Sequence, residues 1–332
     1  MNKLSNWIVA ATVLSLSACG GGASGDSSET QAGVSSGGTG SFSDGPVSSF
    51  GSIVVNGIHF EQSQARVLDA EGQVLSPSDI KLGMVVALSG SPVKRVGTRD
   101  QADANEIRIE KALVGSVDSL GTDSLVVMGQ TVTVSSQQTH YDAALPNGLS
   151  DLSVKDVVTV YGFHDARRNV YMATRIERQS GAVPSHYVVH GVIQDLDAVN
   201  GRCRIGQQTI VYRWGADAVG LMNGRVATAQ VSPMPYVSSD SSGGTQTLWQ
   251  GQLMTLDRPM VSDKDQASLD GVVTSLALDA AGVIGVNGIA VDTRQMVCAA
   301  CSSLNVGDRI QVVGRLVNEV VVASKLTVQA SN

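Results

Sequence analysis

Two short stretches decide the fold: Val55-Asn56-Gly57-Ile58 and Val286-Asn287-Gly288-Ile289. Asn-Gly between β-branched residues predicts a β-hairpin with a two-residue turn, because both turn residues must adopt a positive φ angle and Asn and Gly tolerate it. Two related stretches, Met128-Gly129-Gln130 and Ile205-Gly206-Gln207, lie in corresponding places between the first two. This recurrence predicts a repeated β unit.

The remaining strands of the unit also recur. Each hairpin follows a Gly-x-Val-like strand that begins at Gly45, Gly115, Gly191 or Gly271, with offsets of 70, 76 and 80 residues. An alternating strand comes next, at 82–90, 154–162 and 306–314, with a degenerate copy at 223–229. A last strand closes each copy, at 104–110, 172–178, 248–256 and 322–328.

This order predicts an all-β chain. Three strands, a less regular connection and two strands match an oligonucleotide/oligosaccharide-binding (OB)-like Greek-key barrel. A half-open sandwich of five strands fits the pattern nearly as well. We therefore predict a tandem array of four small five-stranded OB-like Greek-key barrels or half-open sandwiches behind a flexible tether.

Composition agrees with strands and limits the function. Of 332 residues, 48 are Val and only 16% are charged, so long charged helices cannot dominate. The formal net charge of -7 argues against nucleic-acid binding, because there is no basic excess to displace counterions from phosphates. Single acidic residues such as Asp118, Asp156 and Asp308 stand at predicted turns, where their side chains can accept backbone N–H groups.

The N-terminus reads as a secretory signal. Lys3 precedes an apolar run at 7–16, and the segment ends in Leu16-Ser17-Ala18-Cys19. It resembles the signal and lipobox of bacterial lipoproteins. That resemblance implies cleavage before Cys19, lipidation of Cys19 and anchoring to a lipid bilayer. Gly20, in place of an inner-membrane retention Asp, implies the outer membrane, with the side unspecified.

The expected boundaries follow from these signals. Between Gly20 and Asp44, eight Gly and seven Ser predict a flexible tether. The segments are a signal peptide at 1–18, lipidated Cys and tether at 19–44, and modules at 45–111, 112–180, 187–258 and 269–330. The third module is divergent, because Trp214, two prolines and a Ser/Gly loop interrupt its pattern, and its closure into a barrel is left open.

The repeated pattern is similar to a family of secreted bacterial β modules whose function is uncharacterised, a domain of unknown function. The resemblance covers 45–328 and rests on the Val-Asn-Gly hairpin and the Val-Gly-Asp-x-Val-x-Val-x-Gly strand. It implies no catalytic residues.

The cysteines give one candidate for chemistry. Cys298 and Cys301 form a C-x-x-C pair within a β module, without the strand-helix context of a thioredoxin-like site. We expect a local disulfide in an oxidising periplasm; a redox pair, a metal site, pairing with Cys203 or free thiols are alternatives. Cys203 itself is expected to be a small buried residue.

A second candidate is a possible ligand face on the last hairpin of the second module. Aromatic and basic side chains gather there, and such groups stack on sugars or bases: Tyr161, Phe163, Arg167, Arg168, Tyr171 and Arg175. Ordinary strand packing is the alternative interpretation. Trp214, Tyr236 and Trp249 form a weaker candidate of the same kind in the third module.

No catalytic, cofactor or metal motif emerges from the sequence. Gly33-Val34-Ser35-Ser36-Gly37 matches a nucleophile elbow but lies in the predicted tether, and 195–201 reads as a turn rather than a calcium loop. We therefore expect a non-enzymatic envelope lipoprotein that acts as a structural or protein-interaction scaffold, without a cofactor. Possible partners are an envelope protein or a glycan. The alternatives are glycan or small-ligand binding through a barrel face, and a periplasmic redox protein that uses Cys298 and Cys301.

Overall fold

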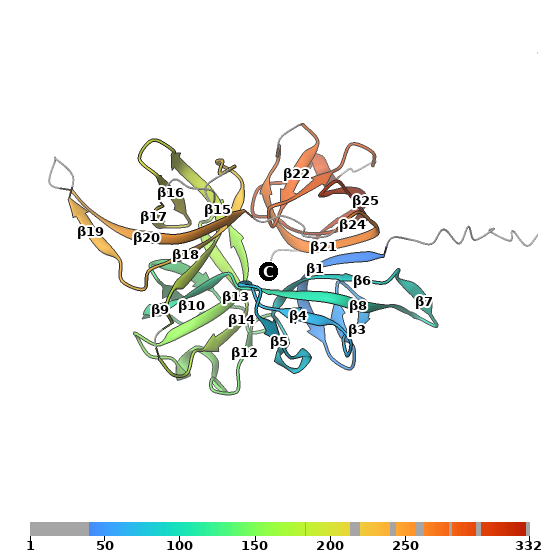
Figure 1. The fold of residues 1–332 in the computed structure, drawn as a ribbon, viewed down its shortest axis with the longest axis horizontal. Helices are drawn as coiled ribbons and strands as arrows, with labels where there is room; N and C mark the ends of the chain where they lie inside the picture. The colour runs from blue at the N-terminus through green and yellow to red at the C-terminus, as the bar shows by residue number, and fades with distance from the viewer. Residues whose placement is uncertain are drawn as a thin grey trace, which may run out of the picture. The chain divides into compact units, whose positions relative to one another are not determined.

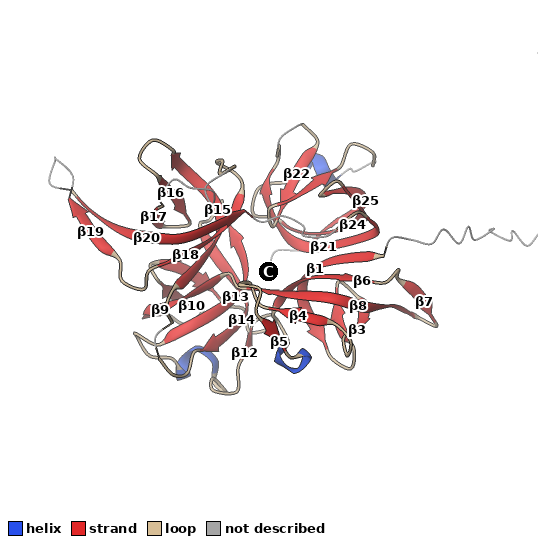
Figure 2. Ribbon diagram, in the orientation of Figure 1, coloured by secondary structure: helices blue, strands red, loops and turns tan. Residues whose placement is uncertain are grey.

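β-strands make up most of the structure. The computed structural model describes residues 40–182, 184–212, 220–239, 244–256, 262–278, 281–296 and 300–329. The helical elements in these ranges are short 3-10 turns: η1 (Pro77–Asp79), η2 (Gly148–Asp151) and η4 (Ala300–Ser303) (Figure 2). The predicted all-β fold is confirmed.

Four modules follow one another along the chain (Figure 1). Module 1 contains β1 (Ser41–Ser49), β2 (Ile53–Val55), β3 (Ile58–Glu61), β4 (Arg66–Leu68), β5 (Val74–Leu75), β6 (Val85–Gly90), β7 (Lys94–Val96) and β8 (Arg99–Glu110). Module 2 contains β9 (Leu113–Leu120), β10 (Ser124–Val127), β11 (Gln130–Thr133), β12 (His140–Tyr141), β13 (Val157–Asp165) and β14 (Val170–Arg178).

The second half of the chain repeats the arrangement. Module 3 contains β15 (Tyr187–Asp197), β16 (Arg202–Ile205), β17 (Gln208–Val211), β18 (Val226–Val231), β19 (Tyr236–Ser239) and β20 (Thr245–Leu256). Module 4 contains β21 (Lys264–Ser275), β22 (Val283–Val286), β23 (Ile289–Asp292), β24 (Arg309–Val317) and β25 (Val320–Val328).

Each module closes into a small barrel with the same pairing order. In module 2, β9 pairs with β10 and β10 with β11; β11 runs parallel to β14, β14 pairs with β13, and β13 returns to β9. Modules 1 and 4 repeat this circuit. So does the divergent module 3, whose closure the sequence left open. This is the predicted OB-like order.

The Asn-Gly turns form as predicted. Asn56 and Gly57 have φ angles of 54° and 80°, and Asn287 and Gly288 have 49° and 85°. Each pair connects two strands in register, Val55 with Ile58 and Val286 with Ile289. These are the angles of the hairpin turn that fits the twist of the strands.

The glycine that ends the alternating strand has a steric cause. At Gly162 the β13–β14 register shifts, and a Cβ there would collide with the carbonyl oxygen of Met172. Gly90 and Gly314 lie at equivalent register shifts and face equivalent carbonyls. The bulge bends the strand so that the small barrel can close, and only glycine lets the backbones approach this closely.

The turn aspartates also behave as expected. Asp156 Oδ2 accepts the Ser153 N–H at 2.9 Å, and Asp308 Oδ2 accepts the Asn305 N–H at 2.8 Å. Each carboxylate therefore caps the turn that leads into the fourth strand of its barrel.

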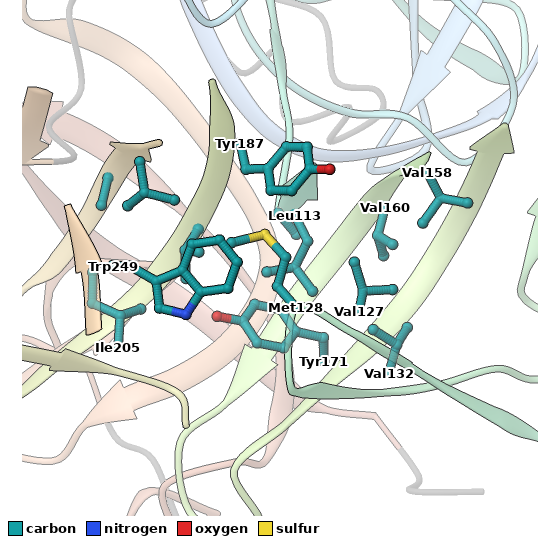
Figure 3. Close-up of a cluster of buried hydrophobic side chains, with 14 of the residues drawn as sticks. Leu113, Val127, Met128, Val132, Val158, Val160, Tyr171, Tyr187, Ile205 and Trp249 are labelled. Carbon is teal, nitrogen blue, oxygen red and sulfur yellow. The ribbon is translucent and has the colours of Figure 1, made fainter. Parts of the chain in front are cut away.

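The hydrophobic cores cross module boundaries. Modules 2 and 3 share one cluster that includes Leu113, Tyr171, Ile205 and Trp249 (Figure 3). The core of module 4 takes in Phe42 from β1, and the core of module 1 takes in Tyr161 from β13. Small barrels bury little apolar area alone, so these shared clusters supply stability that one module lacks.

The first strand begins at Ser41, inside the segment expected to be tether. Residues 41–44 are buried because β1 lies between two strands: it is antiparallel to β6 and parallel to β21 of module 4. Modules 2 and 3 are joined differently, through antiparallel β9 and β15. Among the described strands, module 1 thus pairs with module 4, and module 2 pairs with module 3.

Candidate functional site

The predicted ligand face lies on β13 and β14, where its aromatic side chains are buried between modules. Tyr161 is 4% exposed, packs against the core of module 1 and donates its hydroxyl to Glu177 Oε2 at 3.1 Å. Phe163 is also buried and contacts Val85 of module 1 and Val272 of module 4. Both rings therefore form module junctions.

Tyr171 faces the shared interior of modules 2 and 3. Its ring is fully buried and stacks on His164 with centroids 4.7 Å apart. His164 Nδ1 accepts the N–H of Val192 in module 3 at 3.3 Å. Burial lowers the pKa of His164 to about 4, so the ring is neutral and serves as an acceptor at neutral pH.

The three arginines of the predicted face separate. Arg175 is buried, with Nε donating to Glu177 Oε1 at 2.7 Å and Nη1 donating to the Leu82 carbonyl of module 1 at 3.1 Å. Arg167 and Arg168 are exposed at the hairpin tip, where Arg168 Nε lies 2.6 Å from Asp165 Oδ2.

Four of the six predicted residues are therefore buried in module contacts: Tyr161, Phe163, Tyr171 and Arg175. Only the two tip arginines present themselves to solvent, so the six do not form one exposed face. In module 3, Trp249 is buried and Tyr236 is 43% exposed, whereas Trp214 lies outside the described residues. Ordinary strand packing, the alternative interpretation of this cluster, therefore accounts for the buried aromatic side chains.

A polar seam joins modules 1 and 4. Ser43 Oγ on β1 and Ser268 Oγ on β21 share a hydrogen bond of 2.6 Å in the buried interface. The turn residue Asn56 donates from Nδ2 to the Asp44 carbonyl at 2.9 Å and the Ser268 carbonyl at 3.1 Å. The side chain of a hairpin turn thus reaches across to the other module.

Asn287, the matching turn residue of module 4, reaches back. Its Nδ2 donates to Asp44 Oδ1 at 3.0 Å, and its Oδ1 accepts the Val272 N–H at 2.9 Å. The two Asn-Gly turns therefore have a second role besides making hairpins: both asparagines hydrogen-bond across or beside the β1–β21 seam.

Arg309 extends this network to module 2. Its guanidinium binds Asp270 in a bidentate manner, with Nε to Oδ1 at 3.0 Å and Nη2 to Oδ2 at 3.1 Å. The same group lies 5.2 Å from the ring centroid of Phe163 in module 2. A planar guanidinium suits both contacts, the carboxylate in its plane and the ring below it.

A reciprocal exchange of glutamines joins modules 2 and 3. Gln130 Nε2 donates to the Ile205 carbonyl at 2.9 Å, and its Oε1 accepts the Gln207 N–H at 2.9 Å. In return, Gln208 Nε2 donates to the Met128 carbonyl. Gln130 and Gln208 each follow a hairpin turn and both are buried, so each turn is held by a side chain of the other module.

The cysteines take no part in the hydrogen bonds described at these junctions. Cys301 is disulfide-bonded, and Cys298 lies outside the described residues. Cys203 is a free, buried thiol of the module 2 and 3 core, and burial raises its pKa to about 12. A thiol in that state is protonated and unreactive at neutral pH.

One further charged cluster lies between modules. Lys111 Nζ is 3.0 Å from Glu71 Oε2, and His186 Nε2 is 3.7 Å from Glu71 Oε1. Burial raises the pKa of Glu71, but the Lys111 charge and hydrogen bond outweigh this and leave it below its usual value. Across the described ranges, no group of three or more His, Cys, Asp or Glu side chains is placed to hold a metal ion.

The junction residues were not identified from the sequence. Asn56 and Asn287 were recognised only as turn formers, and Ser43 and Asp44 were assigned to a tether because of their composition. Gln130 and Gln208 occupy the same place after their turns, and that equivalence is the one sequence signal that could have identified them.

The described residues define a class: an all-β protein of tandem OB-like barrels with hydrogen-bonded polar side chains at its module junctions. Residues 114–177, which span most of module 2, match the family described as domain of unknown function (DUF5666). A comparison with curated proteins gives no match. In the described ranges, no helix has the length and apolar character needed to cross a membrane.

Proposed function

We propose that this chain is a non-enzymatic scaffold of the bacterial cell envelope, held at the outer membrane by lipid on Cys19. The anchor is supported by the lipobox-like Leu16-Ser17-Ala18-Cys19, which lies outside the described residues. The two acyl chains of a diacylglyceryl group and one amide-linked acyl chain make about three membrane anchors, and about two are enough for stable membrane attachment.

The scaffold role rests on one observation: side chains suited to ligand recognition are used to join the modules. The Arg309–Asp270 pair, the Asn56 and Asn287 contacts and the glutamine exchange are hydrogen-bonded across or along buried junctions. Buried side-chain hydrogen bonds of this kind fix the geometry between the groups that they join. A body built in this way is suited to hold partners at fixed positions.

The anchor is tested by Cys19→Ala in the full chain. We expect the unsubstituted chain in the outer-membrane fraction, with an N-terminal peptide whose mass includes acyl chains on Cys19. The variant should lose both the acyl mass and the membrane association. An unacylated N-terminus in the unsubstituted chain would overturn the anchor without affecting the scaffold role.

The scaffold role is tested by crosslinking in cells that produce the lipidated chain. We expect capture of a defined envelope protein, and loss of that capture when Arg309→Ala and Asn287→Ala loosen the module junctions. Exposed Arg66→Ala, on module 1, is the matched control and should retain the partner. Crosslinking that captures no protein would remove the basis for a scaffold.

A further inference from the structure

Module 3 carries a two-stranded ribbon that extends beyond its barrel. β20 pairs with β17 only from Leu248 onward, whereas Thr245–Thr247 pair with β19 alone. β19 in turn pairs only with β20 among the described strands. Figure 1 shows this β19–β20 ribbon projecting from module 3. The segment corresponds to the connection between the fourth and fifth strands of the barrel.

β19 and the residues just before it expose apolar side chains. Met234 is 81% exposed, Val237 67% and Tyr236 43%. The described residues 232–239 and 244–250 contain no Asp, Glu, Lys or Arg, although the whole chain has a net charge of -7; Asp240, which follows β19 in the sequence, lies outside the described residues. An apolar, uncharged patch of this kind on an otherwise acidic protein marks an interaction surface.

The corresponding connection in module 1 provides a contrast. The β7–β8 hairpin also extends from its barrel, but Lys94, Arg95 and Arg99 line it. Charged residues protect an exposed strand edge from pairing with other strands. β19 lacks this protection, and a two-stranded ribbon alone is marginally stable in water, so a third strand would stabilise it.

We infer that the outer edge of β19 pairs with β19 of a second copy of this chain, making an antiparallel, two-fold symmetric dimer. Two observations favour a second copy. β19 is an edge strand of the sheet that already joins modules 2 and 3 through antiparallel β9 and β15, so pairing with a second β19 would extend this sheet from one chain to another. The described residues of the ribbon also carry no charged side chain, so no like charges face one another along the paired strands.

The contact is self-complementary in this arrangement. Antiparallel pairing of identical strands places Tyr236–Ser239 against itself, as a two-fold axis requires. Backbone hydrogen bonds supply the affinity, and Tyr236 and Val237 cover one another across the axis. This inference does not depend on the lipid anchor or on the scaffold role.

The first test measures mass in solution. Residues 38–332 form one compact unit with its own cores, so a chain that begins at Gly38 retains every contact described. Light scattering over a concentration series should approach twice the mass of one chain. Val237→Lys should reduce the mass to that of one chain with an unchanged circular-dichroism spectrum. Val96→Lys, the same substitution on the exposed β7 edge, should leave the dimer intact.

The second test uses the full chain in cells. Val237→Cys with a short bismaleimide should give an adduct of two copies joined at position 237, whereas Val96→Cys and the unsubstituted chain should not. The inference is overturned by a single-chain mass at every concentration, by a dimer that Val237→Lys does not dissociate, or by an adduct of Val237→Cys with a different protein only.

Discussion

The glutamine exchange between modules 2 and 3 predicts a large effect from Gln130→Ala. The substitution deprives the Ile205 carbonyl of a donor and the Gln207 N–H of an acceptor. A net hydrogen bond contributes about 1 kcal/mol, and a buried polar group left unsatisfied costs about 1–3 kcal/mol. We therefore expect the free energy of unfolding of modules 2 and 3 to fall by about 3 kcal/mol.

Urea denaturation followed by tryptophan fluorescence measures this change. A chain that begins at Gly38 retains Trp214 and Trp249, both in module 3, and Trp249 lies in the core shared with module 2. Gln207→Ala is the matched control: the same residue type at the same junction, with an exposed side chain whose hydrogen bond to Thr131 Oγ1 is long at 3.4 Å. Surface substitutions of this kind change stability by less than about 0.5 kcal/mol.

The hydrogen bond that Gln208 donates to the Met128 carbonyl allows a second test of the exchange. Because Gln130 holds the turn of module 3 and Gln208 holds the turn of module 2 at one junction, the double substitution to Ala should be non-additive by about 0.5–3 kcal/mol. If Gln130→Ala unfolds at the same urea concentration as Gln207→Ala, the exchange contributes nothing and the junction is held by apolar packing alone.

Three further predictions concern β13 and β14. Burial lowers the pKa of His164 to about 4, whereas a histidine in the unfolded chain has a pKa of about 6.5, so protonation of His164 favours unfolding. The free energy of unfolding should keep its full value above about pH 6.5 and should fall by about 2–3 kcal/mol by about pH 4.5. Urea curves at the two pH values check this, and His164→Gln should remove that part of the slope. Tyr171→Phe should leave stability unchanged or raise it, because its buried hydroxyl has no hydrogen-bond partner among the described residues. Tyr161→Phe should lower stability by about 1 kcal/mol through the lost hydrogen bond to Glu177. Thermal denaturation measures both changes. Gly162→Ala should prevent closure of module 2, because a Cβ would collide with the facing carbonyl; loss of the near-ultraviolet circular-dichroism signal would show this, and a native spectrum would contradict it.

The sequence identified the repeat because its signals are local. A positive φ at Asn56 or Asn287 is a requirement of a two-residue turn, and it is visible in four consecutive letters. The glycine after the alternating strand is equally local, since the bulge needs it at a fixed distance from the Val-Gly-Asp turn. The strand order and the barrel followed from these signals without knowledge of distant contacts.

The junctions could not be predicted in the same way. Pairing of β1 with β21 joins residues more than 200 positions apart, and neither strand contains a pattern that specifies its partner. The polar composition of Ser41–Asp44 resembles that of the preceding residues. Composition alone therefore assigns the start of this buried strand to the end of the tether. Composition reports how polar a segment is, but not whether its polar groups are satisfied by water or by another module.

The aromatic residues show why the predicted ligand face and the module junctions involve the same side chains. Only 4% of the chain is aromatic, and each barrel is too small to be stable on apolar burial of its own. Large rings bury the most area per residue, so they contribute most where two modules meet. Tyr161 and Phe163 accordingly pack against modules 1 and 4, and Tyr171 packs in the core shared with module 3. In a chain with so few rings, an aromatic cluster in the sequence is therefore better evidence for a junction than for a binding face, and exposed Tyr236 stands out because no module covers it.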